Sequence, residues 1–365
     1  MIIYTFLFSI FLCLLSNPFK KNNLTLVVFV FISLFLFLLA AFRLGDADYL
    51  EYKKIFDLTP ELNNFLYISA KKVHGEVGYF FINSTFKYIG FEFTSVIFFI
   101  ALLSVILTCI SSFKLSPAPT IAIILYFSHF FILREMIQIR AGLSISIIIF
   151  SIAYCKKKTH IFLFILIAAL FHKASLILLP FIFLYNRKKI RLKIIFIFIL
   201  IAYIFQDVNI LKLILNQFSV LGFLPESINN YLNSTLYSSQ LPILTNPVFW
   251  KAILIILITN KFIETEKKDN INIETANRII FLWNLYSLGL VLMIFLSNFS
   301  ILSGRLSTFL FLGENILITY GLLILNKKNR LLIGYPFVLL MASLQIFFDL
   351  SIKNNHAETS FIFLN

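Results

Sequence analysis

The sequence predicts an all-α, polytopic helical membrane protein, and three observations support this prediction. Of its 365 residues, 60% are hydrophobic and only 13% are charged, whereas about a quarter of the residues in soluble domains are charged. The mean hydropathy is +0.93. Apolar runs that approach the roughly 20 residues needed to cross a bilayer recur along the chain. We therefore expect a single integral membrane domain over residues 1–365.

About twelve transmembrane helices are expected from these runs. The first run lacks a basic segment and a cleavage site made of small residues, so we interpret it as a retained helix rather than a signal peptide. Two runs hold only about 15 and 14 residues, or about 21 to 23 Å of helix against a hydrocarbon core of roughly 30 Å. Their polar ends should therefore lie within the outer leaflet, around a recess. The runs are residues 2–16, 24–42, 91–113, 119–133, 141–155, 159–172, 174–186, 190–206, 247–260, 279–299, 306–325 and 331–349.

Basic residues between the runs predict the orientation of the chain. Every second connection contains Lys or Arg, and the positive-inside rule places these connections in the cytoplasm and both termini outside. The formal net charge of +14 could indicate nucleic-acid binding, but the basic residues form no basic domain, so no nucleic-acid partner is expected. The residues that predict the orientation are Lys20, Lys21, Lys114, Lys156, Lys157, Lys158, Arg187, Lys188, Lys189, Arg191, Lys193, Lys261, Lys267, Lys268, Arg278, Lys327, Lys328 and Arg330.

Two long segments fall on the opposite, outer side. Residues 43–90 form an outer loop, and its stretch from Glu76 to Asn83 has the amphipathic pattern of an interfacial helix. Residues 207–246 form a second outer loop, which we interpret as a lid or a sugar-contacting loop. The outer side also receives the polar clusters that we identify between apolar runs. These are Asp46 and Asp48; Glu76; Arg134, Glu135, Gln138 and Arg140; His172 and Lys173; and Arg305.

The polar residues between 131 and 144 are the strongest indication of a site. An arginine at mid-bilayer costs roughly 2.5 to 3.5 kcal/mol, so ionisable residues in such positions usually line a cavity or pair with another group. The alternative is an ordinary loop whose arginines reach lipid headgroups, but it explains neither Glu135 nor Gln138. Arg134 and Gln138 share a face of a straight helix, whereas Arg140 is about 240° from Arg134. Convergence of the two arginines therefore requires a break between them.

These residue types favour a phosphorylated lipid as the ligand. The sequence contains no P-loop, HExxH, GxSxG or GxGxxG motif, and its five His and three Cys are too scattered for a metal site, so neither a metal nor a cofactor is expected. Arginine forms bidentate, charge-assisted hydrogen bonds with phosphate. Fixed cations also stabilise a diphosphate leaving group without a metal. The cations that could hold a diphosphate are Arg134, Arg140, Arg305 and Lys173.

Transfer of a sugar would also require a general base for the acceptor hydroxyl. The candidates are Glu135, His172, Asp46 and Asp48. The two aspartates can instead be turn residues, and His172 can mark an interfacial helix end. Arg305 can likewise be an outer anchor.

Three tyrosines lie in the outer segment 43–90. Tyr49, Tyr52 and Tyr79 fit an interfacial aromatic belt better than a set of sugar-stacking residues.

An ordered set of motifs on the outer side resembles a known family. It consists of Gly45-Asp46 with Tyr49, Glu76-Val77-Gly78-Tyr79, Gln138-Ile139-Arg140-Ala141-Gly142-Leu143-Ser144, Phe171-His172-Lys173-Ala174-Ser175-Leu176-Ile177, and Arg305 before a late span. This set resembles the EpsG-like group of bacterial polysaccharide polymerases, which are related in role to O-antigen polymerases of the Wzy type. The resemblance covers roughly residues 40 to 325, and the segment 207–247 has no matching motif.

The resemblance implies a metal-independent glycosyltransferase of the GT-C kind in the bacterial inner membrane, with its active site facing the periplasm. Such a polymerase moves a growing glycan from undecaprenyl diphosphate to a newly flipped lipid-linked repeat unit. Arg140 and Arg305 would hold the diphosphates, His172 would orient or deprotonate the acceptor, and Gln138 would contact phosphate or sugar. Glu76 and Tyr79 would join the substrate site.

The expected partners are undecaprenyl-diphosphate-linked oligosaccharide, membrane lipids and a chain-length regulator. Two other functions remain open at this point. One is an O-antigen ligase or another transferase of lipid-linked sugars, which differs only in its acceptor. The other is a flippase or transporter of lipid-linked oligosaccharide, although a flippase needs polar groups along a passage open to both faces and the predicted polar groups gather on one side.

Overall fold

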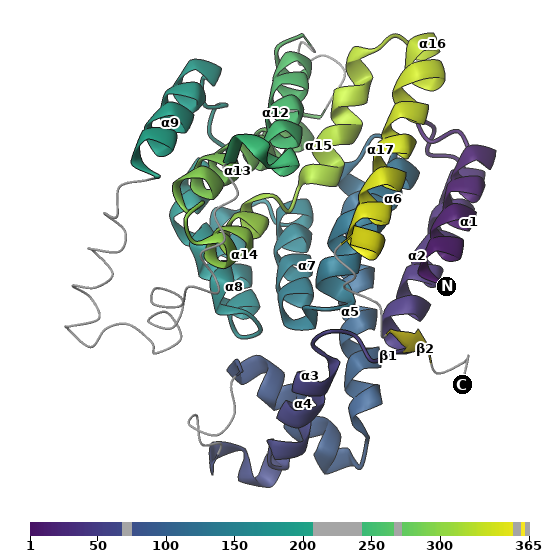
Figure 1. The fold of residues 1–365 in the computed structure, drawn as a ribbon, viewed down its shortest axis with the longest axis vertical. Coiled ribbons are helices and arrows are strands. Elements are labelled where there is room, and N and C mark those ends of the chain that lie inside the picture. Colours follow the sequence, from purple (N-terminus) through teal and green to yellow (C-terminus); the bar gives the residue numbers. More distant parts are fainter. Residues whose placement is uncertain (68–74, 207–242, 266–271, 353–358, 362–365) are drawn as a thin grey trace. The chain divides into compact units, whose positions relative to one another are not determined.

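The computed structural model describes residues 1–67, 75–206, 243–265, 272–352 and 359–361. Helices account for nearly all of the described structure, which confirms the all-α class (Figure 1). The chain forms two compact units: a first unit made of Met1–Leu176 and Ile318–Asn365, and a second unit made of Ile177–Leu317. The single domain over 1–365 and the outer loops 43–90 and 207–246 stay predictions, and residues 207–242 lie outside the described part.

The first unit is built mainly from long apolar helices. Its helices are α1 (Ile2–Leu15), α2 (Asn23–Ala41), α3 (Tyr49–Leu58), η1 (Leu62–Tyr67), α4 (Val77–Ile89), α5 (Phe93–Leu115), α6 (Pro119–Tyr126), η2 (Phe127–Glu135), α7 (Ile139–Tyr154), α8 (Lys158–Ala169), η6 (Leu322–Ile324), α16 (Lys327–Asn329), η7 (Arg330–Gly334), α17 (Tyr335–Phe347) and η8 (Phe348–Ile352). A short antiparallel pair joins β1 (Arg43–Leu44) to β2 (Ser360–Phe361), with Arg43 opposite Phe361.

Helix α2 illustrates how an entirely apolar segment divides its two faces. Ile32 and Leu36 are fully buried in the core of the first unit. Leu26, Val30 and Leu34, on the other face, are about half exposed. An apolar face that lacks a protein neighbour suits contact with lipid, because a helix that is hydrophobic all round belongs in a membrane or in a large core.

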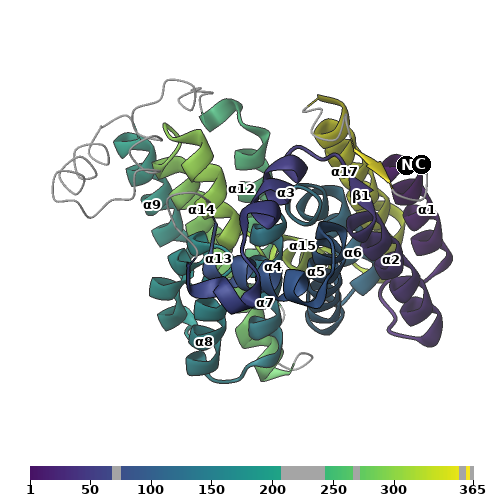
Figure 2. The same ribbon diagram turned by 90° about the horizontal axis from the view of Figure 1, so that it is seen from below.

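The described residues of segment 43–90 form helices that pack on one another. Helices α3 and α4 lie side by side next to the start of α5 (Figures 1 and 2). At that start, the ring of Phe93 contacts the rings of Tyr49 and Phe56, with centroids 5.3 and 5.8 Å apart. Helix α3 is therefore anchored to a candidate span.

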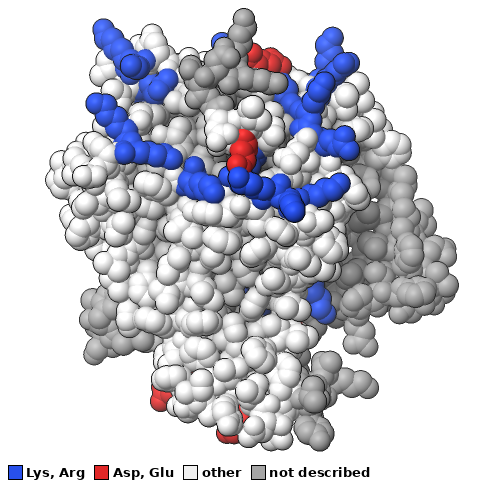
Figure 3. Space-filling view, turned by 180° about the vertical axis from the view of Figure 1, so that it is seen from behind, with Lys and Arg blue, Asp and Glu red and all other residues white. Residues whose placement is uncertain are grey.

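One end of the first unit collects the connections that we predict to be cytoplasmic. Lys21 donates a 2.7 Å hydrogen bond to the carbonyl of Phe113, at the end of α5. Lys114 lies 3.8 Å from the ring centre of Tyr154, at the end of α7. These two contacts place the C-terminal ends of α5 and α7 at the same, basic end of the first unit. Helix α7 begins with Ile139, at its other end. On the face drawn in Figure 3, Lys and Arg side chains gather in one zone beside a wide uncharged zone.

A broken span begins in the second unit and ends in the first. The helices of the second unit are η3 (Lys173–Leu184, which starts in the first unit), α9 (Leu192–Phe205), η5 (Ile243–Thr245), α12 (Pro247–Thr265), α13 (Ile273–Phe295), α14 (Ser300–Leu310) and α15 (Glu314–Gly321, which ends in the first unit). Residues 301–310 and 314–324 together are apolar enough to cross a membrane but are bent by 57°. The prediction of a loop from Ser300 to Arg305 and a continuous span over 306–325 was therefore wrong.

The break has a packing reason. A Cβ atom on Gly313 would lie 2.9 Å from Leu282, and one on Gly289 would lie 2.8 Å from Leu310. Glycines at these two positions let the bend approach α13 closely. Arg305, which we expected in a loop, instead lies on α14 before the bend.

In the described residues, four helices are long and apolar enough to cross a membrane, or up to five if the bent pair is one span. They are accompanied by shorter apolar helices such as α1, α7 and α8. Each of the twelve predicted apolar runs overlaps a helical segment. The protein is a multi-pass membrane protein, whereas a total of twelve crossings and a GT-C architecture stay predictions.

Candidate functional site

Three of the sequence motifs converge in the first unit around Arg140. We call the residues Arg140, Glu76, His172, Tyr52 and Tyr79 the Arg140 cluster. Arg140 is the second residue of α7, Glu76 directly precedes α4, and His172 lies between α8 and η3. Tyr52 is on α3 and Tyr79 is on α4. The cluster lies at the start of α7, opposite the end where Lys114 contacts Tyr154.

The carboxylate of Glu76 bridges two basic side chains. Its Oε2 lies 2.5 Å from Nη1 of Arg140, and its Oε1 lies 3.4 Å from Nδ1 of His172. The backbone N–H of Lys173 also donates to Glu76. The side chains of Arg140 and Glu76 are 20% and 12% exposed, so the pair is largely buried but still reached by solvent. A cation, a carboxylate and an imidazole thus form one connected, accessible group.

Two tyrosines hold the guanidinium of Arg140. The carbon at its centre lies 5.5 Å from the ring centre of Tyr52 and 5.8 Å from that of Tyr79. Tyr52 also forms a side-chain hydrogen bond with Arg140. Cation–π contact favours this arrangement and orients the planar fork. Tyr52 is 5% and Tyr79 0% exposed, so the interpretation of these two residues as an interfacial belt was wrong.

Gly78 explains why the sequence reads Glu-Val-Gly-Tyr before α4. Its N–H donates a 2.7 Å hydrogen bond to the carbonyl of Leu170, near the end of α8. A Cβ atom at this position would lie only 2.8 Å from that carbonyl oxygen. Only glycine allows this close approach. The contact between α4 and α8 brings Glu76 within reach of His172.

Glu76 lies outside the candidate spans, and its surroundings alter its acidity. Burial alone would raise the pKa of Glu76, but the hydrogen bond from His172 and the charge of Arg140 outweigh burial, so the pKa lies below its ordinary value. Glu76 is therefore a carboxylate at neutral pH, and it keeps the positive charge of Arg140 in place.

Glu135, predicted as a base, is the last residue of η2 and contacts another face of α7 than the one that carries Arg140. Ser146, which donates to its Oε1 over 3.2 Å, is about 240° around the helix from Arg140. Tyr126 donates to the same oxygen over 2.9 Å. Glu135 is only 3% exposed, and a Cβ atom on Gly142 would lie 2.6 Å from its Oε2. The structure therefore does not bring Glu135 into the Arg140 cluster.

Asp46, a second predicted base, is paired with an arginine that we had not singled out. Its Oδ2 lies 2.8 Å from Nε of Arg43, and both side chains are at most 1% exposed. The backbone N–H of Asp48 donates to Oδ1 of Asp46 over 3.1 Å, which matches the alternative of a turn residue. An arginine three residues before an aspartate, at the end of an apolar run, was the signal for this pair.

The other predicted residues are distributed more widely. Arg134 donates to the side-chain oxygen of Gln138, and the expected break lies between η2 and α7, at residues 136–138. The Lys173 side chain is exposed. Arg305 is exposed on α14 in the second unit. No group of three or more His, Cys, Asp or Glu that could hold a metal occurs among the described residues.

The comparison with protein families identifies the chain. The model of the EpsG family matches residues 26–363, nearly the whole length, and includes the entire Arg140 cluster. The chain belongs to the EpsG family. This membership confirms the resemblance that the ordered motifs indicated. No curated protein and no solved structure matches the chain.

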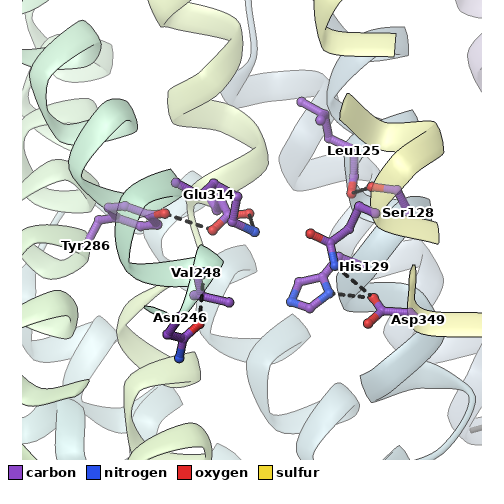
Figure 4. A network of polar contacts seen from close by, with 10 residues as sticks. Leu125, Ser128, His129, Asn246, Val248, Tyr286, Glu314 and Asp349 are labelled. Atoms are coloured by element: carbon purple, nitrogen blue, oxygen red, sulfur yellow. Dashed lines mark hydrogen bonds and ion pairs between the residues drawn. The ribbon is translucent and has the colours of Figure 1, made fainter. Parts of the chain in front are cut away.

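The structure of this EpsG-family chain also contains polar contacts between distant residues that sequence reasoning missed. In the first unit, Nδ1 of His129 lies 2.8 Å from Oδ2 of Asp349 (Figure 4). In the second unit, Nζ of Lys251 lies 2.9 Å from Oε1 of Glu314. A single charged residue inside an apolar run was the available signal, because such residues rarely occur in spans without a role.

Proposed function

We propose that this EpsG-family chain is a polysaccharide polymerase of the bacterial inner membrane. It would transfer a glycan from undecaprenyl diphosphate to a new lipid-linked repeat unit at the periplasmic face, with a GT-C-like architecture. The observation that carries the proposal is the Arg140 cluster, in which a stacked arginine, a carboxylate and a histidine meet at the end of the first unit opposite its basic end. Membership of the EpsG family supports it.

In this proposal Arg140 binds the diphosphate. A guanidinium offers five N–H donors in a rigid fork, so it can bind Glu76 and a phosphate oxygen at the same time. Tyr52 and Tyr79 fix the plane of the fork before the substrate arrives. A prepositioned cation stabilises the charge that develops on a leaving diphosphate. The resemblance also implies that Arg305, on α14 of the second unit, binds a diphosphate.

His172 serves as the general base, with Glu76 orienting its ring through Nδ1. The acceptor hydroxyl loses its proton to Nε2 of His172 while its oxygen bonds to the anomeric carbon of the donor sugar. The bond from that carbon to the diphosphate oxygen breaks, and its electron pair leaves with undecaprenyl diphosphate. Such a base typically contributes about 10²- to 10⁴-fold to the rate.

Replacement of Arg140 tests the proposal. In a strain that lacks the chromosomal gene, Arg140→Ala should stop chain extension, so that the surface polysaccharide runs on a gel as single repeat units. Arg140→Lys should also impair extension, because an ammonium cannot reproduce the bidentate fork. Arg187→Ala, which removes an exposed arginine, is the matched control and should give long chains.

Each variant is compared at equal amounts of membrane-inserted protein. Long chains from Arg140→Ala would reject the proposal. In the gene deletion, long chains that stay on the carrier lipid would instead indicate a ligase, and lipid-linked units stranded in the inner leaflet would indicate a flippase.

A further inference from the structure

The second unit contains its own polar centre, formed by side chains from three helices. Oε1 of Glu314 on α15 lies 2.9 Å from Nζ of Lys251 on α12. The hydroxyl of Tyr286 on α13 donates to Oε2 over 2.8 Å (Figure 4). Tyr286 is fully buried, whereas the side chains of Lys251 and Glu314 keep 18% and 10% of their surface exposed. Both carboxylate oxygens are therefore oriented, and the charged pair is still reached from outside.

This centre lies where the bent span is interrupted. Glu314 is the first residue of α15, directly after the break that separates α14 from α15. Interrupted helices within membranes are tolerated where they are buried in protein or line a cavity, and they commonly carry polar substrate sites. Lys251 lies nine residues before Asn260, which accepts a hydrogen bond from Lys189. Lys251 is thus about 13 Å along α12 from the contact between Lys189 and Asn260.

A purely structural role explains the ionised groups poorly, because apolar and backbone contacts already join these helices. Gly289 packs against Leu310, and Gly313 packs against Leu282. Nε1 of Trp283 donates to the carbonyl of Ile256 over 3.1 Å, which ties α13 to α12. Replacing a buried ion pair by well-packed apolar residues is often neutral or stabilising. A lysine on a largely apolar helix and a glutamate at the break of a candidate span therefore indicate a function.

We propose that Lys251, Tyr286 and Glu314 bind the saccharide part of a lipid-linked substrate, an inference that rests on the proposed function. The lysine and the glutamate together carry no net charge, and the carboxylate repels phosphate, so the ligand is a neutral, hydroxyl-rich sugar rather than the diphosphate. Glu314 accepts hydrogen bonds from sugar hydroxyls, and the ammonium of Lys251 donates to sugar oxygens. Tyr286 keeps the carboxylate oriented.

Binding measurements with two lipids test this site on the purified full-length protein in lipid nanodiscs. The probes are the lipid-linked repeat unit from the native host and undecaprenyl diphosphate without sugar. Glu314→Gln should weaken binding of the repeat unit about tenfold, as expected for loss of hydrogen bonds to a charged group. It should leave binding of the sugar-free lipid within about twofold. Glu264→Gln is the matched control. Glu264 is an exposed glutamate of the same unit, and the substitution removes its 2.7 Å pair with Lys189.

A second variant keeps the test decisive if Glu314→Gln fails to fold. Tyr286→Phe retains the ring and loses only the donor, so it should weaken repeat-unit binding a few-fold with the same selectivity. Unchanged affinity for the repeat unit in a folded variant, or an equal loss for both lipids, would overturn the saccharide site. The proposed function is judged separately, by the chain length that Arg140→Ala makes and by the product of the gene deletion.

Discussion

Two arginine–carboxylate pairs of the first unit have the same chemistry and different surroundings. Arg43 and Asp46 are three residues apart, and their side chains are 1% and 0% exposed. Arg140 and Glu76 are 64 residues apart in the chain, and theirs are 20% and 12% exposed. The first pair closes a turn after α2, whereas the second joins α7 to the start of α4 and also reaches His172. A structural pair and a candidate site therefore differ in how exposed their side chains are and in which other groups they contact, and not in residue type.

The largest expected effect on stability follows from breaking the closed pair. Arg43→Met should lower the free energy of unfolding by about 3 to 5 kcal/mol, because Asp46 is left as a buried charge without compensation. The double variant Arg43→Met/Asp46→Leu should recover most of that loss, since it removes both charges. Thermal unfolding of the purified protein in detergent measures both effects. A loss below about 1 kcal/mol in the single variant would show that the pair is more open than its burial indicates.

The more exposed pair, Arg140 and Glu76, should show the opposite pattern, with a smaller effect on stability and a larger effect on activity. Glu76→Gln should lower the free energy of unfolding less than Arg43→Met does, by about 1 to 3 kcal/mol, because this pair is largely buried but still reached by solvent. It should nevertheless lower the rate of chain extension about 10²-fold, because His172 loses the carboxylate that orients it. Rates with purified lipid-linked substrate, at equal protein, provide the measurement. A variant with normal rates would contradict the role of Glu76.

The pH dependence of stability gives a further test of the pair formed by Arg140 and Glu76. Because the folded pKa of Glu76 is depressed, its pair contributes stability above the pKa of an unfolded glutamate, and this contribution is lost as pH falls through the lower folded value. The part of the stability that depends on Glu76 should therefore be complete above the ordinary glutamate range near pH 4.3 and decrease progressively below it, as pH falls through the lower folded pKa. The stability difference between the native protein and Glu76→Gln, measured as pH is lowered, should shrink only below that range.

A smaller effect is expected from Gly78. In Gly78→Ala the new Cβ must move away from the carbonyl of Leu170, which shifts the start of α4 and pulls Glu76 from His172. Extension should fall several-fold, with repeat-unit binding nearly intact. Gly304→Ala is the matched control, because open space surrounds that position, and it should not slow extension. Equal rates of chain extension in Gly78→Ala and Gly304→Ala would show that extension does not require the close approach of Gly78 to Leu170.

Much of the fold was predictable, because helices in a membrane follow local composition. Apolar runs predicted the helical segments, and the motif order predicted the EpsG family. Arg140, Glu76, Tyr79 and His172 were all candidates before the structure was known, and the structure brings them together. The break in the late span was missed because its cause lies in the packing of Gly289 and Gly313 against other residues.

By itself, the sequence determined the class, the family, the helical runs and the residue types available for binding a diphosphate. These properties depend on composition and on short motifs, and each can be evaluated within a window of about 20 residues. Only the tertiary structure decided which charges are paired and which stay accessible. That choice paired Asp46 with Arg43, buried Glu135 beside Tyr126, and placed Tyr52 against Arg140. The physical reason is that burial and ion pairing depend on neighbours from distant parts of the chain.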